Sequence, residues 1–194
     1  KASKAPRWDA TYAVVERVVI TCIGLITPLG IGTAETWQAL LAGRSGIAPI
    51  TLFDASQHRV RIAGEVKSWE PTRWIERKHL KEMDRFTEFA LGAAALAIED
   101  AGLVLTDAER RRAGCFVGVG LGGLATLEKA KEALMTRGPT KVSPFAIVSM
   151  IANLAAGHVS IAHELRGPSY CTTSACSSGA HAIGEATEWI RRGK

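Results

Sequence analysis

Alternation between strand-like and helical segments is the feature that most restricts the fold of this chain. The β-branched run of residues 17–23 and the apolar run of residues 113–119 are typical of buried strands. Each is followed by a glycine-containing turn and then by apolar residues at helical spacing. Residues 168–172 form a third strand-like run in front of a helix. Strands that alternate with helices predict an α/β fold with a largely parallel sheet.

Helix boundaries are predicted where residue types match known capping patterns. These are Thr33 as the cap of a helix that runs to Leu41, Asp84 and Gly102 at the two ends of a long helix, the capping box Thr106/Glu109, and a helix start with proline at Ser143-Pro144. The long helix contains the small residues 92–95, so we expect it to pack closely against a neighbour.

Composition is that of a folded domain. Hydrophobic residues make up 47% and charged residues 22% of 194, which is enough for a sizeable core and argues against disorder. Residues 1–16 lack periodicity and are interpreted as a tail or linker, which leaves 17–194 as the folded unit. The longest apolar stretch, 145–159, is too short and too polar to span a bilayer, and no secretory signal is visible. We therefore expect no membrane insertion.

The net charge is +5, and basic residues lie in short clusters at 77–81 and 110–112. Aromatic residues are only 6%, which disfavours a nucleic-acid module because such modules interleave exposed aromatics with basic residues. An acidic protein partner fits the basic clusters better. The four cysteines and five histidines show no metal-ligand spacing. We predict no metal site, reduced thiols and a cytoplasmic location.

The segment from Gly118 to Gly123 satisfies the G-x-G-x-x-G pattern between a strand and a helix. A dinucleotide site would also need a second strand that ends in an acidic residue about 20 positions further on. Residues 137–141 do not form such a strand end. We therefore expect no cofactor, and we interpret the glycines as allowing the loop to approach a substrate or a helix closely.

Cys176 lies in a run of small residues, 174–180, between the strand-like segment and a helix. A sharp turn is expected here, with Ser174 or Ala175 near the cap position. The unpaired N–H groups and the dipole at the start of a helix favour negative charge, so they could stabilise a thiolate and a developing oxyanion. This predicts a cysteine nucleophile that accepts an acyl group. The alternative is a buried free cysteine that serves only in packing.

Eight motifs occur in order along the chain. They are Val-Val-Ile-Thr (18–21), Thr-Pro-Leu-Gly (27–30), Leu-Ala-Gly-Arg-Ser-Gly-Ile (41–47), Met-Asp (83–84), Gly-Leu-Gly-Gly-Leu (120–124), Lys-Val-Ser-Pro-Phe (141–145), Leu-Arg-Gly-Pro (165–168) and Ser-Ala-Cys-Ser-Ser-Gly (174–179). Taken together they resemble the N-terminal half of a β-ketoacyl-acyl-carrier-protein synthase, of the elongating type II kind. The resemblance implies a thiolase-like fold, layered αβαβα, of which this chain is the N-terminal half, and a homodimer.

The resemblance also implies a reaction. Cys176 would accept an acyl chain from acyl-carrier protein, and malonyl-carrier protein would then lose CO2 and attack the thioester in fatty-acid chain elongation. Leu121 and Ala146 would line the acyl-chain pocket. Four basic residues fall in regions that dock the carrier protein in the family: Lys78, Lys81, Arg137 and Lys141.

In the family, two histidines and a lysine from the C-terminal half polarise the malonyl thioester, and none of the histidines here matches their motifs. We therefore expect a fragment of a longer enzyme, or one part of a nicked chain, that exposes a large apolar face and does not condense by itself. Three related functions stay open: a ketosynthase of polyketide assembly, a non-condensing chain-length partner subunit, and a thiolase acting on coenzyme A thioesters. Cys176 argues against the partner subunit, and the basic positions with residues 142–145 favour the carrier-protein branch over the thiolase.

Overall fold

The computed structural model describes residues 17–194, so the proposed tail of residues 1–16 lies outside the described part. Seven α-helices occur in the described part: α1 (Thr33–Leu41), α2 (Arg85–Ala101), α3 (Asp107–Arg110), α4 (Leu124–Arg137), α5 (Ala146–Met150), α6 (Leu154–Ala162) and α7 (Ser178–Arg191). Short 3₁₀ turns lie between them: η1 (Pro71–Arg73), η2 (Arg77–Glu82), η3 (Pro139–Lys141) and η4 (Ala175–Ser177).

The strands of the described residues form three two-stranded sheets. They are β1 (Ile26–Thr27) with β2 (Gly30–Ile31), β3 (Ile47–Pro49) with β4 (Ile62–Gly64), and β5 (Cys115–Gly118) with β6 (Ser169–Thr172). Only the third pair is parallel, so the expectation of a largely parallel sheet is met there alone. The other two pairs are antiparallel, because β1 and β2 are joined by a tight turn and β3 and β4 by a loop without a crossover helix.

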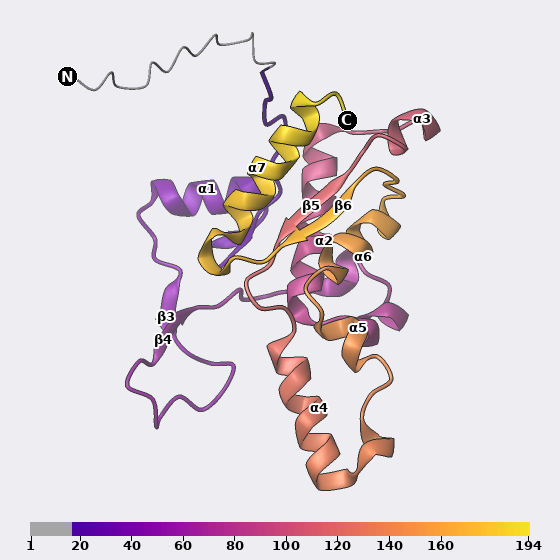
Figure 1. Ribbon diagram of the computed structural model, residues 1–194. Coiled ribbons are helices and arrows are strands. Elements are labelled where there is room, and N and C mark those ends of the chain that lie inside the picture. Colours follow the sequence, from indigo (N-terminus) through magenta and orange to yellow (C-terminus); the bar gives the residue numbers. More distant parts are fainter. Residues whose placement is uncertain (1–16) are drawn as a thin grey trace, which may run out of the picture.

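The parallel pair lies in the middle of a layered arrangement (Figure 1). Helix α7 packs on one side of β5 and β6, and α6 packs on the other, with α2 behind it. The buried core lies between β5, α6 and α2 and consists of six residues: Ile75, Met83, Leu91, Cys115, Ala156 and Val159. The sheet therefore sits between helices, which is the α/β arrangement that the sequence predicts.

Helix α2 begins and ends where the capping residues predict. Asp84 Oδ1 accepts a hydrogen bond from Arg85 N at 2.6 Å, and Gly102 ends the helix in the left-handed conformation with φ 56°. The close approach expected for its small residues is present, because a Cβ added to Gly24 would lie 2.0 Å from Ala93 O. The capping box of Thr106 at the start of α3 is also confirmed.

The strand predicted for residues 17–23 is wrong. These residues form no ladder with another strand in the described part of the chain, and Val19 and Ile20 are 71% and 76% exposed. Side chains take the place of a neighbouring strand at Ile23, whose N–H donates to Asp100 Oδ2 at 2.9 Å and whose carbonyl accepts from Thr33 Oγ1 at 2.8 Å. A β-branched run becomes a strand only when a second strand pairs with it.

Two predicted helix starts are shifted. Thr33 is the first residue of α1 rather than its cap, and Gly32 occupies the cap position. Ser143 and Pro144 do not start a helix; Ser143 Oγ accepts from Phe145 N at 3.2 Å, and α5 follows this turn. The side chain of serine closes a local turn as readily as it caps a helix, so the sequence signal is ambiguous.

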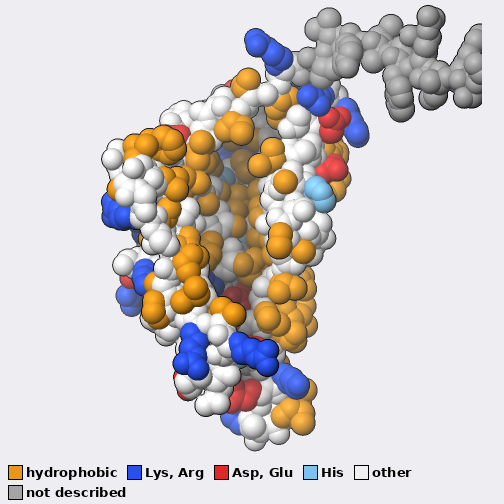
Figure 2. Space-filling model, turned by 90° about the vertical axis from the view of Figure 1, so that its left-hand side faces the viewer, with side chains coloured by type: hydrophobic (Ala, Val, Ile, Leu, Met, Phe, Trp, Pro, Cys, Tyr) orange, Lys and Arg blue, Asp and Glu red, His pale blue; other side chains and the backbone are white. Residues whose placement is uncertain are grey.

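The described residues expose many large hydrophobic side chains, as expected for half of a layered core. Trp37, Leu41, Ile161 and Ile183 are each more than half exposed. Figure 2 shows a hollowed face lined by hydrophobic side chains, with lysine and arginine side chains gathered toward its lower end. In the described part of the chain, none of the helices combines the length and the apolar character that crossing a bilayer requires.

Candidate active site

Cys176 lies on η4, in the sharp connection between β6 and α7 (Figure 1). The thiol is exposed and free. Ala175, directly before it, has φ 51°, a left-handed conformation that is uncommon for a residue with a side chain. The predicted turn is confirmed, although Ser174 caps η4 and Ser177 is the cap residue of α7. The amino end of a 14-residue helix, which attracts negative charge, therefore begins two residues after the thiol.

The side chain of Ser178 fixes the shape of this turn. Ser178 is 2% exposed, and its hydroxyl accepts a hydrogen bond from Ser174 N at 2.8 Å. The same hydroxyl lies 2.7 Å from Ala175 O and 3.3 Å from Val119 O, which are both acceptors. One buried serine thus connects the residues before Cys176, the start of α7 and the end of β5.

The backbone of β5 approaches the start of α7 very closely. A Cβ added to Gly118 would lie 2.3 Å from Ser178 C and O and 2.4 Å from Gly179 N. Only glycine allows this approach. Of the two interpretations of the Gly118–Gly123 segment, the close approach to a helix is therefore confirmed at its first glycine.

A second polar contact ties the turn to α7. Ser174 Oγ and His181 Nδ1 are 2.6 Å apart, which joins the residue two positions before Cys176 to the first turn of the helix. Thr172 Oγ1 donates to Ser178 O at 2.8 Å from the end of β6. The turn that presents Cys176 is thus held from both sides.

Cys176 and Cys115 are expected to differ strongly in reactivity. Burial raises the pKa of the Cys115 thiol, which is 8% exposed in the core, whereas Cys176 is exposed. Because the thiolate is the reactive form, iodoacetamide at mildly alkaline pH should modify Cys176 faster than Cys115 by more than about tenfold. Peptide mass spectrometry over time measures both rates, and labelling in urea provides the control. Equal rates in the folded chain would contradict this geometry.

Leu121 directly follows a glycine that approaches the turn of Cys176. It is 81% exposed in the loop after β5, and a Cβ added to the adjacent Gly120 would point to within 3.9 Å of Ala175 O. Further along the loop, Gly123 N donates to Met150 O at 2.8 Å, which joins the loop to α5. The position of Leu121 is compatible with the predicted pocket, and its role there stays a prediction.

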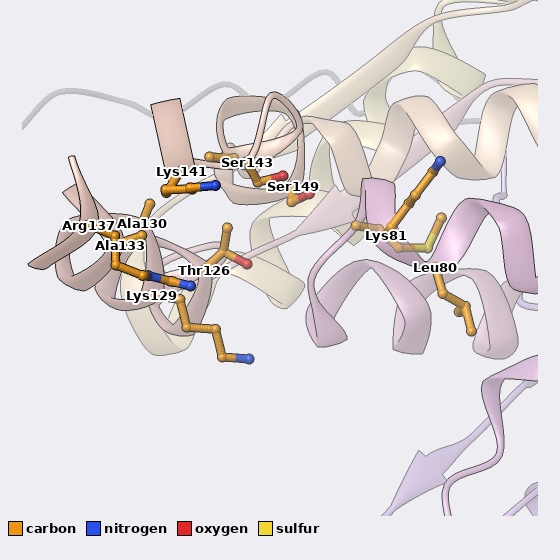
Figure 3. Close-up of a pocket in the computed structure, with 12 residues that line it drawn as sticks. Leu80, Lys81, Thr126, Lys129, Ala130, Ala133, Arg137, Lys141, Ser143 and Ser149 are labelled. Atoms are coloured by element: carbon orange, nitrogen blue, oxygen red, sulfur yellow. The ribbon is translucent and has the colours of Figure 1, made fainter. Parts of the chain in front are cut away.

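Ala146 lies elsewhere. It is 8% exposed at the start of α5 and lines a cavity of about 280 Å³ between η2, α4, η3 and α5 (Figure 3). Neither Cys176 nor Leu121 is among the residues that line this cavity. Three of the four predicted docking residues do line it: Lys81, Arg137 and Lys141. Lys78 instead forms an ion pair with Glu76 at 2.8 Å on the surface of η2, and this contact raises the pKa of Lys78.

Two residues were not predicted from the sequence: Lys129 at the cavity and Ser178 at the turn of Cys176. Lys129 lines the cavity beside the predicted cations, and it belongs to one face of α4. The face is visible in the sequence as a helical stripe of Thr126, Lys129, Ala130, Ala133 and Arg137. The sequence gives a weaker indication for Ser178. Its place in a run of small residues suggests a turn but does not reveal which groups its hydroxyl contacts.

Comparison with known proteins identifies relatives across nearly the whole chain. The family model "Beta-ketoacyl synthase, N-terminal domain" matches residues 15–194. The 3-oxoacyl-[acyl-carrier-protein] synthase 2 of Synechocystis sp. is 44% identical over 92% of this chain and 43% of its own length. The protein of the same name from Coxiella burnetii is 44% identical over 90% of this chain and 42% of its own length. The chain thus spans less than half the length of these relatives.

Solved structures agree with the sequence relatives. The ishigamide ketosynthase/chain length factor is similar with a TM-score of 0.78 and 30% identity, over 90% of this chain and 44% of its own. A beta-ketoacyl synthase from Burkholderia phymatum has a TM-score of 0.75 and 31% identity, over 91% of this chain and 44% of its own.

Proposed function

The chain belongs to the β-ketoacyl synthase family as its N-terminal domain, and we propose that it supplies the acyl-accepting cysteine of a 3-oxoacyl-[acyl-carrier-protein] synthase in fatty-acid chain elongation. The observation that carries the proposal is the exposed thiol of Cys176 on a strained, hydrogen-bonded turn at the amino end of α7. Relatives named 3-oxoacyl-[acyl-carrier-protein] synthase 2 are 44% identical to this chain, which supports the elongating synthase over a ketosynthase of polyketide assembly.

The proposed chemistry is an acyl transfer between two sulfurs. The Cys176 thiolate attacks the carbonyl carbon of the acyl-carrier thioester, and the negative charge moves to the carbonyl oxygen. Backbone N–H groups at the start of α7 would stabilise this charge. When the carbonyl forms again, the bond to the carrier sulfur breaks and the carrier leaves as a thiolate. The acyl chain then remains on Cys176 as a thioester.

The turn geometry supports this role because hydrogen bonds restrict the backbone conformation of the turn that carries Cys176. Ser178 and His181 both hold Ser174, two residues before Cys176, while the thiol itself stays accessible. A nucleophile that is fixed before the substrate arrives loses little entropy in the reaction. A cysteine with only a packing role would be expected in the core, where Cys115 lies.

We place the acyl-carrier protein at the basic surface around Lys81, Arg137 and Lys141. Carrier docking fits because these side chains lie together, and none of them forms an ion pair within the described part of the chain. Complementary charges guide the encounter of two proteins and fix their orientation. The homodimer stays a prediction of the family resemblance, and the cytoplasmic location stays a prediction of the cysteine pattern.

Acyl loading tests the proposed function directly. The chain is incubated with acyl-carrier protein that carries a medium-length acyl group, and peptide mass spectrometry then locates any added acyl mass. We expect one acyl group on the Cys176 peptide, released by hydroxylamine as a thioester. Acyl mass on another cysteine, or an unmodified Cys176 after a small neutral acyl thioester at high concentration, would contradict the proposal.

Charge reversal tests the docking surface. Arg137→Glu combined with Lys141→Glu should slow loading from the carrier protein by about tenfold or more at low salt, because the encounter is electrostatically guided. Loading from a small neutral acyl thioester should be unchanged. Lys131→Glu is the matched control, since Lys131 is exposed on the same helix and does not line the cavity. An equal loss with Lys131→Glu would show that net charge, and not this surface, controls loading.

A further inference from the structure

The cavity that Ala146 lines combines two kinds of surface. Four side chains carry positive charge: Lys81, Lys129, Arg137 and Lys141. Five others are apolar: Leu80, Met83, Ala130, Ala133 and Ala146. In Figure 3, Arg137 and Lys141 extend from one side of the space, and Leu80 and Lys81 lie on the opposite side. Cationic and apolar side chains therefore occur together around the space, a combination that suits a ligand with a charged head and an apolar tail.

The positive charge of this cavity is not neutralised by the protein. None of its lining residues is acidic, and the ion pairs of the described residues include none of its four cations. Two nearby carboxylates have other partners: Asp84 Oδ2 accepts from Thr126 N and Oγ1 at 3.0 and 2.6 Å, and Glu82 Oε2 lies 3.0 Å from His79 Nδ1. An anion is therefore the complementary head group, and an arginine with a nearby lysine suits a carboxylate or a phosphate.

Three of the five apolar side chains that line the cavity are almost removed from solvent. Met83, Ala133 and Ala146 are 8%, 4% and 8% exposed. Ser149 is 4% exposed and also lines the cavity. Its hydroxyl and those of Thr126 and Ser143 add polar groups to the lining. The small side chains of the alanines leave the space open, and a short alkyl chain could fill it with favourable burial of apolar area.

We propose that this cavity binds a small amphipathic anion, with a carboxylate or phosphate head at Arg137 and Lys141 and a short alkyl tail against Ala133 and Ala146. The site is separate from Cys176, which does not line it, so the ligand is bound without a covalent bond. It overlaps the proposed docking surface of the carrier protein. If that docking is correct, a free acyl anion in the cavity competes with the carrier and slows loading of Cys176.

Calorimetric titration of the chain tests the site without using the carrier protein or Cys176 chemistry. The probes are octanoate, inorganic phosphate, which has only a charged head, and octylamine, which has the same tail with the opposite charge. We expect saturable binding of one octanoate, at least about tenfold weaker binding of phosphate, and no binding of octylamine. Absence of octanoate binding, or equal binding of octylamine, overturns the proposal.

Variants locate the bound probe. Arg137→Gln and Ala146→Leu should each weaken octanoate binding by about tenfold, the first by removing a head-group contact and the second by filling the tail space. Lys131→Gln should leave it unchanged, and circular dichroism checks that each variant is folded. Binding that survives Arg137→Gln and a folded Ala146→Leu places octanoate elsewhere and overturns the site. Acyl loading of Cys176 is measured separately, so failure of the cavity and failure of the proposed function give different results.

Discussion

Replacing Cys176 with alanine abolishes acyl loading of the chain. The variant lacks the only atom that forms the proposed thioester, so the rate falls by at least about 10³-fold, as expected when a covalent nucleophile is removed. The measurement is the mass of the peptide that contains residue 176 after incubation with the acylated carrier protein. Because the Cys176 side chain is exposed, the free energy of unfolding should change by no more than about 0.5 kcal/mol.

Cys171→Ala is the matched control for this experiment. Cys171 lies on β6, five positions before Cys176, and is half-buried. It should keep normal loading, because nothing places its thiol at the start of α7. If the Cys176→Ala variant still gains an acyl group, the assignment of the nucleophile is wrong. If both variants lose loading while folded, the acyl group depends on the shape of this region and not on one thiol.

The features that were predictable from the sequence are local. The turn at Cys176, the boundaries of α2 and the capping box at Thr106 depend on residues within one or two turns of each other. The parallel pairing of β5 and β6 is a long-range exception, which follows from two strand-like runs separated by helices. The thiolase-like α/β fold that the motifs implied is confirmed for the N-terminal half by the similarity to solved ketosynthase structures.

The features that were missed depend on contacts between distant segments. Whether residues 17–23 form a strand is decided by the presence of a partner strand, which no local pattern reveals. The role of Ser178 depends on Val119, which lies 59 positions away in the chain. Lys129 could have been found, because its helical spacing to Arg137 places both on one face of α4. Ala146 was predicted from family position to line the acyl-chain pocket, which stays a prediction, and the cavity that it lines here is set by how α4 and η2 pack around α5.

Replacing Gly118 with alanine should separate β5 from α7. The added Cβ would lie 2.3 Å from backbone atoms of Ser178, and backbone cannot rotate away as a flexible side chain can. Either β5 or the start of α7 must move, which lengthens the bond between Ser178 Oγ and Val119 O and loosens the turn at Cys176. We expect a loss of about 1–3 kcal/mol or more in the free energy of unfolding, together with slower acyl loading. Urea unfolding followed by circular dichroism measures the first effect.

Gly184→Ala distinguishes this close approach from a general effect of replacing glycine. Gly184 lies on α7 with no atom near the position of an added Cβ, and alanine is the better helix former. This variant should therefore keep or gain up to about 1 kcal/mol of stability. A Gly118→Ala variant as stable as Gly184→Ala would mean that the contact between β5 and α7 is looser than described. Normal acyl loading in a destabilised Gly118→Ala variant would mean that the strand supports the fold but does not position Cys176.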